Sequence, residues 1–171
     1  MDVIVHAGDV GPQSILMRLE NLAPVIAVRG NNDFDLPLKL VETTTLAGLR
    51  IVVAHTPPHL HRALRAAQGL ASAAAQGLAS AAAQGLASAA TQGSTQAAAQ
   101  EPAQAPSGAG ALSLPVLGIH GHTHIPEFSV SDGVTIVCPG SASCPRGASG
   151  PSVMVLRLGA GVVLGQQLVE V

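Results

Sequence analysis

The sequence predicts a layered α/β domain with a β-rich C-terminal half, and two observations carry this prediction. Four short apolar runs rich in Val and Ile each end in a polar loop, as buried strands of a parallel sheet do. These runs cover residues 3–5, 25–28, 51–54 and 116–119. Later runs with turn residues between them predict strands that close a second sheet, at residues 127–130, 134–138, 152–158 and 162–169.

Two helices are expected between the strands. Residues 12–22 place Ile15, Leu16, Leu19 and Leu22 at intervals of three and four, which predicts a helix that returns the chain to the next strand. Residues 60–67 predict a second, short helix, and residues 46–50 a turn that feeds the strand before His55.

Composition excludes several classes of function. With a net charge of -2 and 11% charged residues, the 171-residue chain has no basic stripe of the kind that nucleic-acid binding needs. No apolar run approaches the roughly 20 residues that span a bilayer, and the N-terminus has no charged segment followed by an apolar one. Cys138 and Cys144 have no second pair with which to form a structural zinc site, and we expect both to be reduced. We therefore expect a cytoplasmic protein with no membrane or nucleic-acid partner.

The middle of the chain, residues 66–110, is a low-complexity repeat. The octapeptide Gln-Gly-Leu-Ala-Ser-Ala-Ala-Ala begins at residues 68 and 76, and a copy ending in Thr begins at residue 84. A period of eight advances a helical wheel by about 80° per copy, so the leucines form no stripe. A Gly in each copy costs about 1 kcal/mol against helix. We expect a disordered or loosely helical loop insertion within one domain spanning residues 1–171; the competing interpretation, a solenoid, normally needs units of roughly 20 residues or more.

The polar loops after the four strands hold the candidate site residues: Asp9, Asn31, His55, His122 and His124. Each loop alone has an ordinary explanation as a turn, a helix cap or a structural histidine. Ligands of open α/β sheets collect beyond the carboxyl ends of the strands, so we expect the four loops to converge. A carboxylate, an amide and imidazoles suit Mn²⁺, Fe²⁺ or Zn²⁺ better than Ca²⁺.

The remaining polar residues near these loops have simpler predicted roles. His6 and His120 are expected to be buried and hydrogen-bonded, and His59 to lie on a solvated face or to line the cleft. Ser141 and Arg146 are candidates for contact with a phosphate.

Taken in order, Gly8-Asp9, Gly30-Asn31-Asn32-Asp33, His55 and Gly121-His122-Thr123-His124 resemble the calcineurin-like metallophosphoesterases, especially their small prokaryotic phosphodiesterase branch. The resemblance implies a four-layer α-β-β-α sandwich in which two divalent ions clamp a phosphate ester and activate a bridging hydroxide. Mn²⁺ is the expected ion, and Fe²⁺, Zn²⁺ and Ni²⁺ also fit. By the same resemblance Asp9 bridges the ions, Asn31, His55 and His122 complete one shell, and His124 serves the other. Asn32 and Asp33 are the candidate catalytic residues.

The sequence departs from the family pattern at two points. The first strand of the family, which ends in Asp-x-His and lies inside a sheet, is missing, so one metal site is complete and the other keeps only Asp9 and His124. Asn32 stands where the family usually has a histidine that stabilises charge or protonates the leaving group, which favours diesters with good leaving groups. The expected function is hydrolysis of a small phosphodiester; the alternative is an inactive fragment, or an interaction scaffold such as the retromer subunit of this fold.

Overall fold

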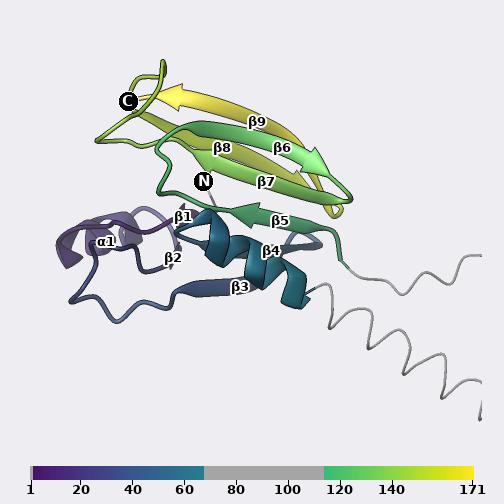
Figure 1. Cartoon of the computed structure of the whole chain (residues 1–171), viewed down its shortest axis with the longest axis horizontal. Coiled ribbons are helices and arrows are strands. Elements are labelled where there is room, and N and C mark those ends of the chain that lie inside the picture. The colour runs from purple at the N-terminus through teal and green to yellow at the C-terminus, as the bar shows by residue number, and fades with distance from the viewer. Residues whose placement is uncertain (1, 68–113) are drawn as a thin grey trace, which may run out of the picture. The chain divides into compact units, whose positions relative to one another are not determined.

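A computed structural model describes residues 2–67 and 114–171 of the chain (Figure 1). Residues 1–65 and 114–171 form one compact unit. The predicted repeat insertion lies outside the described residues, apart from its first two. Among the described helices, none is long and apolar enough to cross a membrane.

The largest element is a five-stranded mixed sheet with the strand order β3-β4-β5-β7-β6 (Figure 1). Neighbouring strands β4, β5 and β7 are parallel, and the two edge strands β3 and β6 run antiparallel to their neighbours. The strands are β3 (Val41–Leu46), β4 (Leu49–Ala54), β5 (Val116–Ile119), β6 (Pro126–Ser131) and β7 (Val134–Pro139).

Two smaller sheets complete the strand set. β1 (Ile4–His6) pairs in parallel with β2 (Val25–Ala27), and β8 (Ser152–Gly159) pairs antiparallel with β9 (Val162–Glu170). Helix α1 (Gln13–Glu20) connects β1 to β2, as the apolar spacing of this segment predicts. A second helix begins at residue 57, three residues earlier than expected, and is described to residue 67.

The structure corrects the predicted strand pairing. The four strands that precede the polar loops do not share one sheet, because β1 and β2 form their own pair while β4 and β5 lie in the five-stranded sheet. β6 and β7 join that large sheet instead of closing the second one. Strand β3 was missed, and the expected turn is the Ala47-Gly48 connection of the β3–β4 hairpin. Side-chain pattern identifies a strand, whereas its hydrogen-bond partner depends on contacts between distant segments.

Packing contacts place these elements in four layers. One face of the large sheet, with Ile51 and Leu117, packs against side chains of both small sheets, such as Val5 and Leu156. Its other face packs Val52 and Ala54 against Leu60 and Leu64 of the second helix. Leu16 of α1 lies in a separate cluster with Val25 and Ala27 of β2. The order helix, small sheets, large sheet, helix is that of the α-β-β-α architecture that the family resemblance implies.

Each small sheet has an open edge within the described part of the chain. Ile4 N donates to Pro24 O at 2.9 Å and Val28 N donates to His6 O at 3.2 Å, so Ile4 and His6 direct their backbone groups toward β2. Because backbone groups alternate in direction along a strand, those of Val5 point to the opposite edge. On β8 the backbone groups of Met154 and Leu156 likewise point away from β9. The backbone groups of Val5, Met154 and Leu156 therefore have no strand partner among the described residues.

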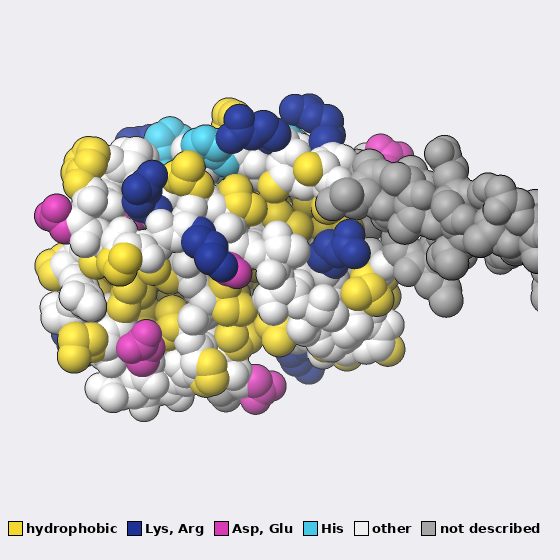
Figure 2. All heavy atoms as spheres, turned by 90° about the horizontal axis from the view of Figure 1, so that it is seen from below, with side chains coloured by type: hydrophobic (Ala, Val, Ile, Leu, Met, Phe, Trp, Pro, Cys, Tyr) yellow, Lys and Arg dark blue, Asp and Glu magenta, His cyan; other side chains and the backbone are white. Residues whose placement is uncertain are grey.

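The surface seen in Figure 2 is mixed. Apolar side chains cover much of this face and are interrupted by single charged residues, while His side chains lie beside Lys and Arg side chains along one margin.

Candidate metal centre

Four side-chain donor atoms from four separate loops converge at the carboxyl ends of β1, β2, β4 and β5. His55 Nε2 lies 2.9 Å from Asn31 Oδ1, 3.2 Å from His122 Nδ1 and 3.5 Å from Asp9 Oδ2. His122 Nδ1 lies 3.0 Å from Asn31 Oδ1. The sequence predicts this convergence correctly for Asp9, Asn31, His55 and His122, even though the strands belong to two sheets.

Hydrogen-bond roles within this group leave lone pairs facing one another. His55 Nδ1 lies 2.7 Å from Ala7 O, and a carbonyl oxygen can only accept, so Nδ1 carries the proton. In the neutral ring, Nε2 then presents a lone pair to Asn31 Oδ1 and Asp9 Oδ2, which are also acceptors. A cation among these atoms would satisfy all of them at once. The side chain of His55 is 4% exposed and that of Asp9 is 22% exposed, so the centre opens on the Asp9 side.

The amide of Asn31 is essential to this candidate centre. Among residues 2–67 and 114–171, no group of three or more His, Cys, Asp and Glu side chains makes a metal site by itself. The Oδ1 atom of Asn31 lies within 3.0 Å of both imidazoles, whereas His55 Nε2 lies 3.5 Å from the carboxylate of Asp9. The donor set therefore mixes oxygen and nitrogen and contains no thiolate, which suits a divalent ion such as Mn²⁺, Fe²⁺ or Zn²⁺.

Backbone strain is concentrated at the predicted ligands. Asp9, His122 and His124 have φ values of 55°, 66° and 61°, in the left-handed backbone region that residues other than Gly rarely adopt. The other such residues, Ala47, Asp132 and Ala160, each precede a Gly of positive φ in a two-residue hairpin turn. Strain of roughly 1–3 kcal/mol per residue, held in place by surrounding contacts, is typical of functional sites.

Two glycines allow the loops of Asp9 and Asn31 to touch. A Cβ atom on Gly8, whose φ is +90°, would lie 2.7 Å from His55 Nδ1. A Cβ atom on Gly30 would collide with the backbone and the carboxylate of Asp9. The glycine before each ligand thus serves close approach of one loop to the other.

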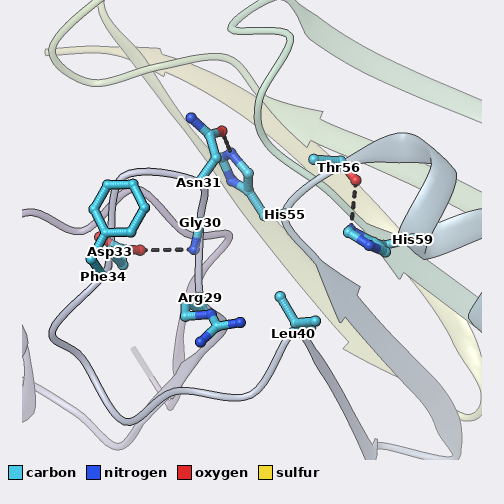
Figure 3. Close-up of a pocket in the computed structure, with 9 residues that line it drawn as sticks. All are labelled: Arg29, Gly30, Asn31, Asp33, Phe34, Leu40, His55, Thr56 and His59. Carbon is cyan, nitrogen blue, oxygen red and sulfur yellow. Dashed lines mark hydrogen bonds between the residues drawn. The ribbon is translucent and has the colours of Figure 1, made fainter.

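Asn32 and Asp33 hold the loops of the centre. Asn32 donates to Asp9 from its backbone N to Oδ1 at 2.9 Å and from Nδ2 to Oδ2 at 2.8 Å. Asp33 is 2% exposed and accepts from Gly30 N at 2.8 Å and from Gly11 N at 3.2 Å (Figure 3). These are the contacts of positioning residues. The catalytic roles expected for Asn32 and Asp33 stay predictions.

The structure places His124 apart from the four donors. Its Nδ1 lies 2.6 Å from Cys144 O, and its own carbonyl accepts from Arg146 N at 3.2 Å. The Nη1 atom of Arg146 donates to His122 O at 3.5 Å, so this arginine supports the loop of both histidines. Within residues 2–67 and 114–171, no hydrogen bond or ion pair joins His124 to Asp9, and the second ion site stays a prediction.

Beneath the loop of His122 lies a buried pair, His120 and Cys138. His120 Nδ1 lies 3.0 Å from Gly121 O and its Nε2 lies 3.4 Å from Glu127 Oε2. Burial lowers the pKa of His120, but the hydrogen bonds to Cys138 and Gly121 outweigh it and raise the pKa to about 8. Burial raises the pKa of the Cys138 thiol, and hydrogen bonds from His120 and Thr123 overcome this and lower it. His120 is buried and hydrogen-bonded as predicted.

His6 departs from its prediction. Its Nδ1 is buried with no hydrogen-bond partner among the described residues. Burial is the main cause that lowers the pKa of His6, against the opposing charges of Asp33 and Asp9. The ring is therefore neutral beside the candidate centre.

A pocket of about 290 Å³ adjoins the donor group (Figure 3). Asn31 and His55 form part of its wall, and Thr56 and His59 lie at the start of the second helix. The sequence predicts Asn31, Asp33 and His55 at the site and His59 at the cleft as one of two options, but it does not predict Arg29, Phe34, Leu40 or Thr56 there. Arg29, Phe34 and Leu40 carry no motif, and only the adjacency of Arg29 to Gly30-Asn31 could have suggested a place at the site.

Comparisons with known proteins agree with this geometry. The family model of the calcineurin-like phosphoesterase superfamily domain matches residues 1–161. A probable metallophosphoesterase of Methanocaldococcus jannaschii is 43% identical over 56 residues, which are 32% of this chain and 28% of that protein. The match thus spans little more than a quarter of the length of that protein.

Solved structures share the fold. Vps29 of Entamoeba histolytica, in a complex with Zn²⁺, aligns with a TM-score of 0.58 at 16% identity, over 100% of this chain and 82% of that one. Vps29 of Cryptosporidium parvum aligns with a TM-score of 0.59 at 14% identity, over 99% of this chain and 80% of that one. The phosphoesterase YfcE of E. coli aligns with a TM-score of 0.51 at 19% identity, over 98% of this chain and 84% of that one. With the family match over most of its length, the chain belongs to the calcineurin-like phosphoesterase superfamily.

Proposed function

We propose that this chain is a metal-dependent phosphoesterase that hydrolyses small phosphodiesters. The observation that carries the proposal is the convergence of Asp9, Asn31, His55 and His122 on one point from four loops far apart in the sequence, with a separation of 91 residues between Asn31 and His122 alone. Family membership supports the same reaction class. The facing lone pairs of His55, Asn31 and Asp9 support the binding of a cation, which catalysis of this kind requires.

Each side chain of the centre has a separate task in this proposal. Ala7 O fixes the tautomer of His55, and the two hydrogen bonds from Asn32 fix the carboxylate of Asp9. A bound divalent ion supplies polarisation of the phosphate and lowers the pKa of attacking water. Asn32 has no titratable proton to give to a leaving group, so diesters with good leaving groups are the favoured substrates.

The metal content belongs to the proposal as well. Mn²⁺ is our first choice, and Fe²⁺, Zn²⁺ and Ni²⁺ fit the same mixed donor set. The Zn²⁺ complex of the Entamoeba histolytica Vps29 supports a divalent ion in this fold. The two-ion mechanism of the family needs a second ion between Asp9 and His124, whose Nδ1 is engaged by Cys144 O. A small phosphodiester substrate, no nucleic-acid partner and a cytoplasmic location complete the proposal.

A second candidate function is an interaction scaffold without catalysis. It is favoured by the orientation of His124 toward Cys144, which leaves the second ion site with few ligands, and by the fold shared with Vps29. The two candidates differ in whether the chain turns over substrate and in how many ions it holds.

The test is hydrolysis of bis(4-nitrophenyl) phosphate by the purified chain with Mn²⁺, together with metal counting on the same samples. His122→Ala removes one donor and should lower bound metal and reduce turnover at least tenfold. His61→Ala, a change of the same kind at an exposed residue of the second helix, is the matched control and should alter neither. Turnover that survives His122→Ala would refute the role proposed for this centre, and no turnover above background in the unchanged chain would overturn the enzyme proposal in favour of the scaffold.

A further inference from the structure

The pocket beside the candidate metal centre is continuous with the centre, because Asn31 and His55 belong to both. Its volume of about 290 Å³ is at the lower end of the range for ligand sites, roughly 300–1,000 Å³. A phosphate held at the donor atoms would therefore place one of its organic substituents in this pocket, and the size suits a single nucleotide-sized group.

One positively charged side chain lines the pocket. Arg29 is the one Lys or Arg in its lining, and among the described residues no side chain forms a hydrogen bond or ion pair with its guanidinium. Asp33 also lines the pocket, but its carboxylate is buried and both oxygens accept backbone hydrogen bonds, from Gly30 and Gly11. Asp33 is therefore engaged by backbone groups, and the guanidinium of Arg29 is left to pair with a negative group of a ligand, for which Arg is well suited when that group is a phosphate.

The rim of the pocket is apolar. Phe34 is 84% exposed and Leu40 is 43% exposed, although burial of such side chains normally stabilises a protein by about 1.5–3 kcal/mol each. Phe34 is one of two Phe in a chain that has no Trp or Tyr. In Figure 3 its ring lies on one side of the Gly30–Asn31 backbone, and Leu40 and His59 lie on the other. An exposed aromatic ring next to an open pocket is a surface on which a planar ring can stack.

The start of the second helix contributes to the same pocket. Thr56 Oγ1 and His59 Nδ1 lie 2.9 Å apart, which fixes the imidazole of His59 in the wall (Figure 3). The positive end of this helix dipole adds to the charge of Arg29.

We propose that this pocket binds a nucleotide-like substituent of the substrate, with its base against Phe34 and a second phosphate against Arg29. This inference rests on the proposed phosphodiesterase function and names the substrate class for it. The substrate would be a phosphodiester that carries a nucleoside and one further phosphate group.

Three substrates with the same 4-nitrophenyl leaving group test the proposal. They are methyl 4-nitrophenyl phosphate, thymidine 5′-(4-nitrophenyl phosphate), and the same thymidine ester with an added 3′-phosphate. With Mn²⁺, kcat/KM should rise about tenfold from the methyl ester to the thymidine ester, and about tenfold again with the 3′-phosphate. Each tenfold step corresponds to roughly 1.4 kcal/mol of binding.

Variants assign each step to its residue. Arg29→Gln should abolish the gain from the 3′-phosphate and keep the gain from the base, and Phe34→Ala should do the reverse. Because each result is a ratio of kcat/KM values within one variant, a change in overall activity does not affect it. Arg62→Gln, at an exposed position of the second helix, is the matched control and should leave both ratios as they are.

The outcomes separate this inference from the proposed function. Metal-dependent hydrolysis of all three esters at similar kcat/KM, or ratios unchanged by Arg29→Gln, would overturn the nucleotide pocket and leave the phosphodiesterase standing. If no ester is hydrolysed, calorimetry with thymidine 3′,5′-bisphosphate decides the pocket: binding weakened about tenfold by Arg29→Gln supports it, and no binding overturns it.

Discussion

At the scale of single residues, the candidate centre is held by contacts that each depend on one small feature. The absence of a side chain at Gly30 lets Asp9 approach, and the carboxylate of Asp33 ties Gly30 to Gly11. The donor atoms themselves make few other contacts. The geometry of the centre is therefore set by its neighbours more than by the ligands.

Gly30→Ala should disrupt the centre because the new methyl group would collide with Asp9. We expect loss of bound Mn²⁺ and a fall of about 2 kcal/mol or more in the free energy of unfolding, as for other overpacked sites. Gly150→Ala is the control, since its Cβ would meet only Glu170 at an ordinary 3.8 Å, and neither glycine has a positive φ. Equal effects of the two substitutions on metal binding and urea unfolding would refute the steric explanation.

The raised pKa of His120 predicts that the free energy of unfolding depends on pH. This pKa of about 8 in the folded chain lies above the unfolded value of 6.5, so protonated His120 stabilises the fold. This contribution, on the order of 1–2 kcal/mol, is fully present below about pH 6.5 and is lost as the pH rises through 8. Cys138 acts in the opposite direction, because its thiol pKa is lowered and its thiolate adds stability as the pH rises. The difference between the free energies of unfolding of the unchanged chain and of His120→Gln, each measured from pH 6 to 9 with a chelator present, should therefore fall across this range.

His120→Gln should remove that part of the pH dependence, and Cys138→Ser should reduce it, because the contact with Cys138 is the largest cause that raises the pKa. A pH profile that is the same in both variants as in the unchanged chain would show that another group is responsible.

At the scale of elements, the second helix and β4 depend on each other. Leu60 is fully buried against Val52 and Leu64, and a Cβ on Gly118 of β5 would lie 3.2 Å from a methyl carbon of Leu60. The helix thus packs directly on strand backbone. Because His55 and Thr56 connect β4 to the second helix, packing of Leu60 also fixes one wall of the candidate site.

Leu60→Ala should destabilise the fold by about 2–5 kcal/mol, through lost burial and the cavity left behind. Leu164→Ala, at a residue of β9 that is 63% exposed, should change the free energy of unfolding by about 0.5 kcal/mol or less. Thermal or urea unfolding of the two variants measures the contrast, and similar losses would contradict the packing described for the helix.

At the scale of the whole molecule, the two small sheets rely on the large one. A two-stranded sheet is marginal in water unless it packs on something else, and both small sheets pack on the same face of the five-stranded sheet. We therefore expect stability to be unevenly distributed, with β4 and β5 at its centre.

Hydrogen exchange should report this distribution residue by residue. The amides of Val52 and Val53 in β4 should exchange at rates set by global unfolding. Within β1, the amide of Ile4, bonded to Pro24 O, should be protected more than that of Val5, which points to the open edge. Protection of Val5 equal to that of Ile4 would mean that this edge is covered in solution.

Much of this architecture could be predicted from the sequence, and the exceptions have physical causes. Apolar runs with following turns located eight of the strands, and the shared position of the polar loops located the four donors of the centre. The sequence pattern did not predict strand β3, because Val41–Leu46 is a polar, Thr-rich edge strand without an apolar run. The pairing of strands and the lining of the pocket by Arg29 and Phe34 depend on how distant segments meet, which local pattern does not encode.

The open edges of β1 and β8 border an apolar pocket, and this pocket affects how the molecule responds to pressure. Val5 of β1, Leu156 of β8 and Ile51 of β4 line this pocket of about 130 Å³, in which every lining side chain is apolar. Void volume that disappears on unfolding makes the unfolded chain the smaller one, so hydrostatic pressure should favour unfolding more than in a fully packed relative. An apolar gas such as xenon, which binds in apolar pockets, should oppose that effect and raise the pressure of half-unfolding.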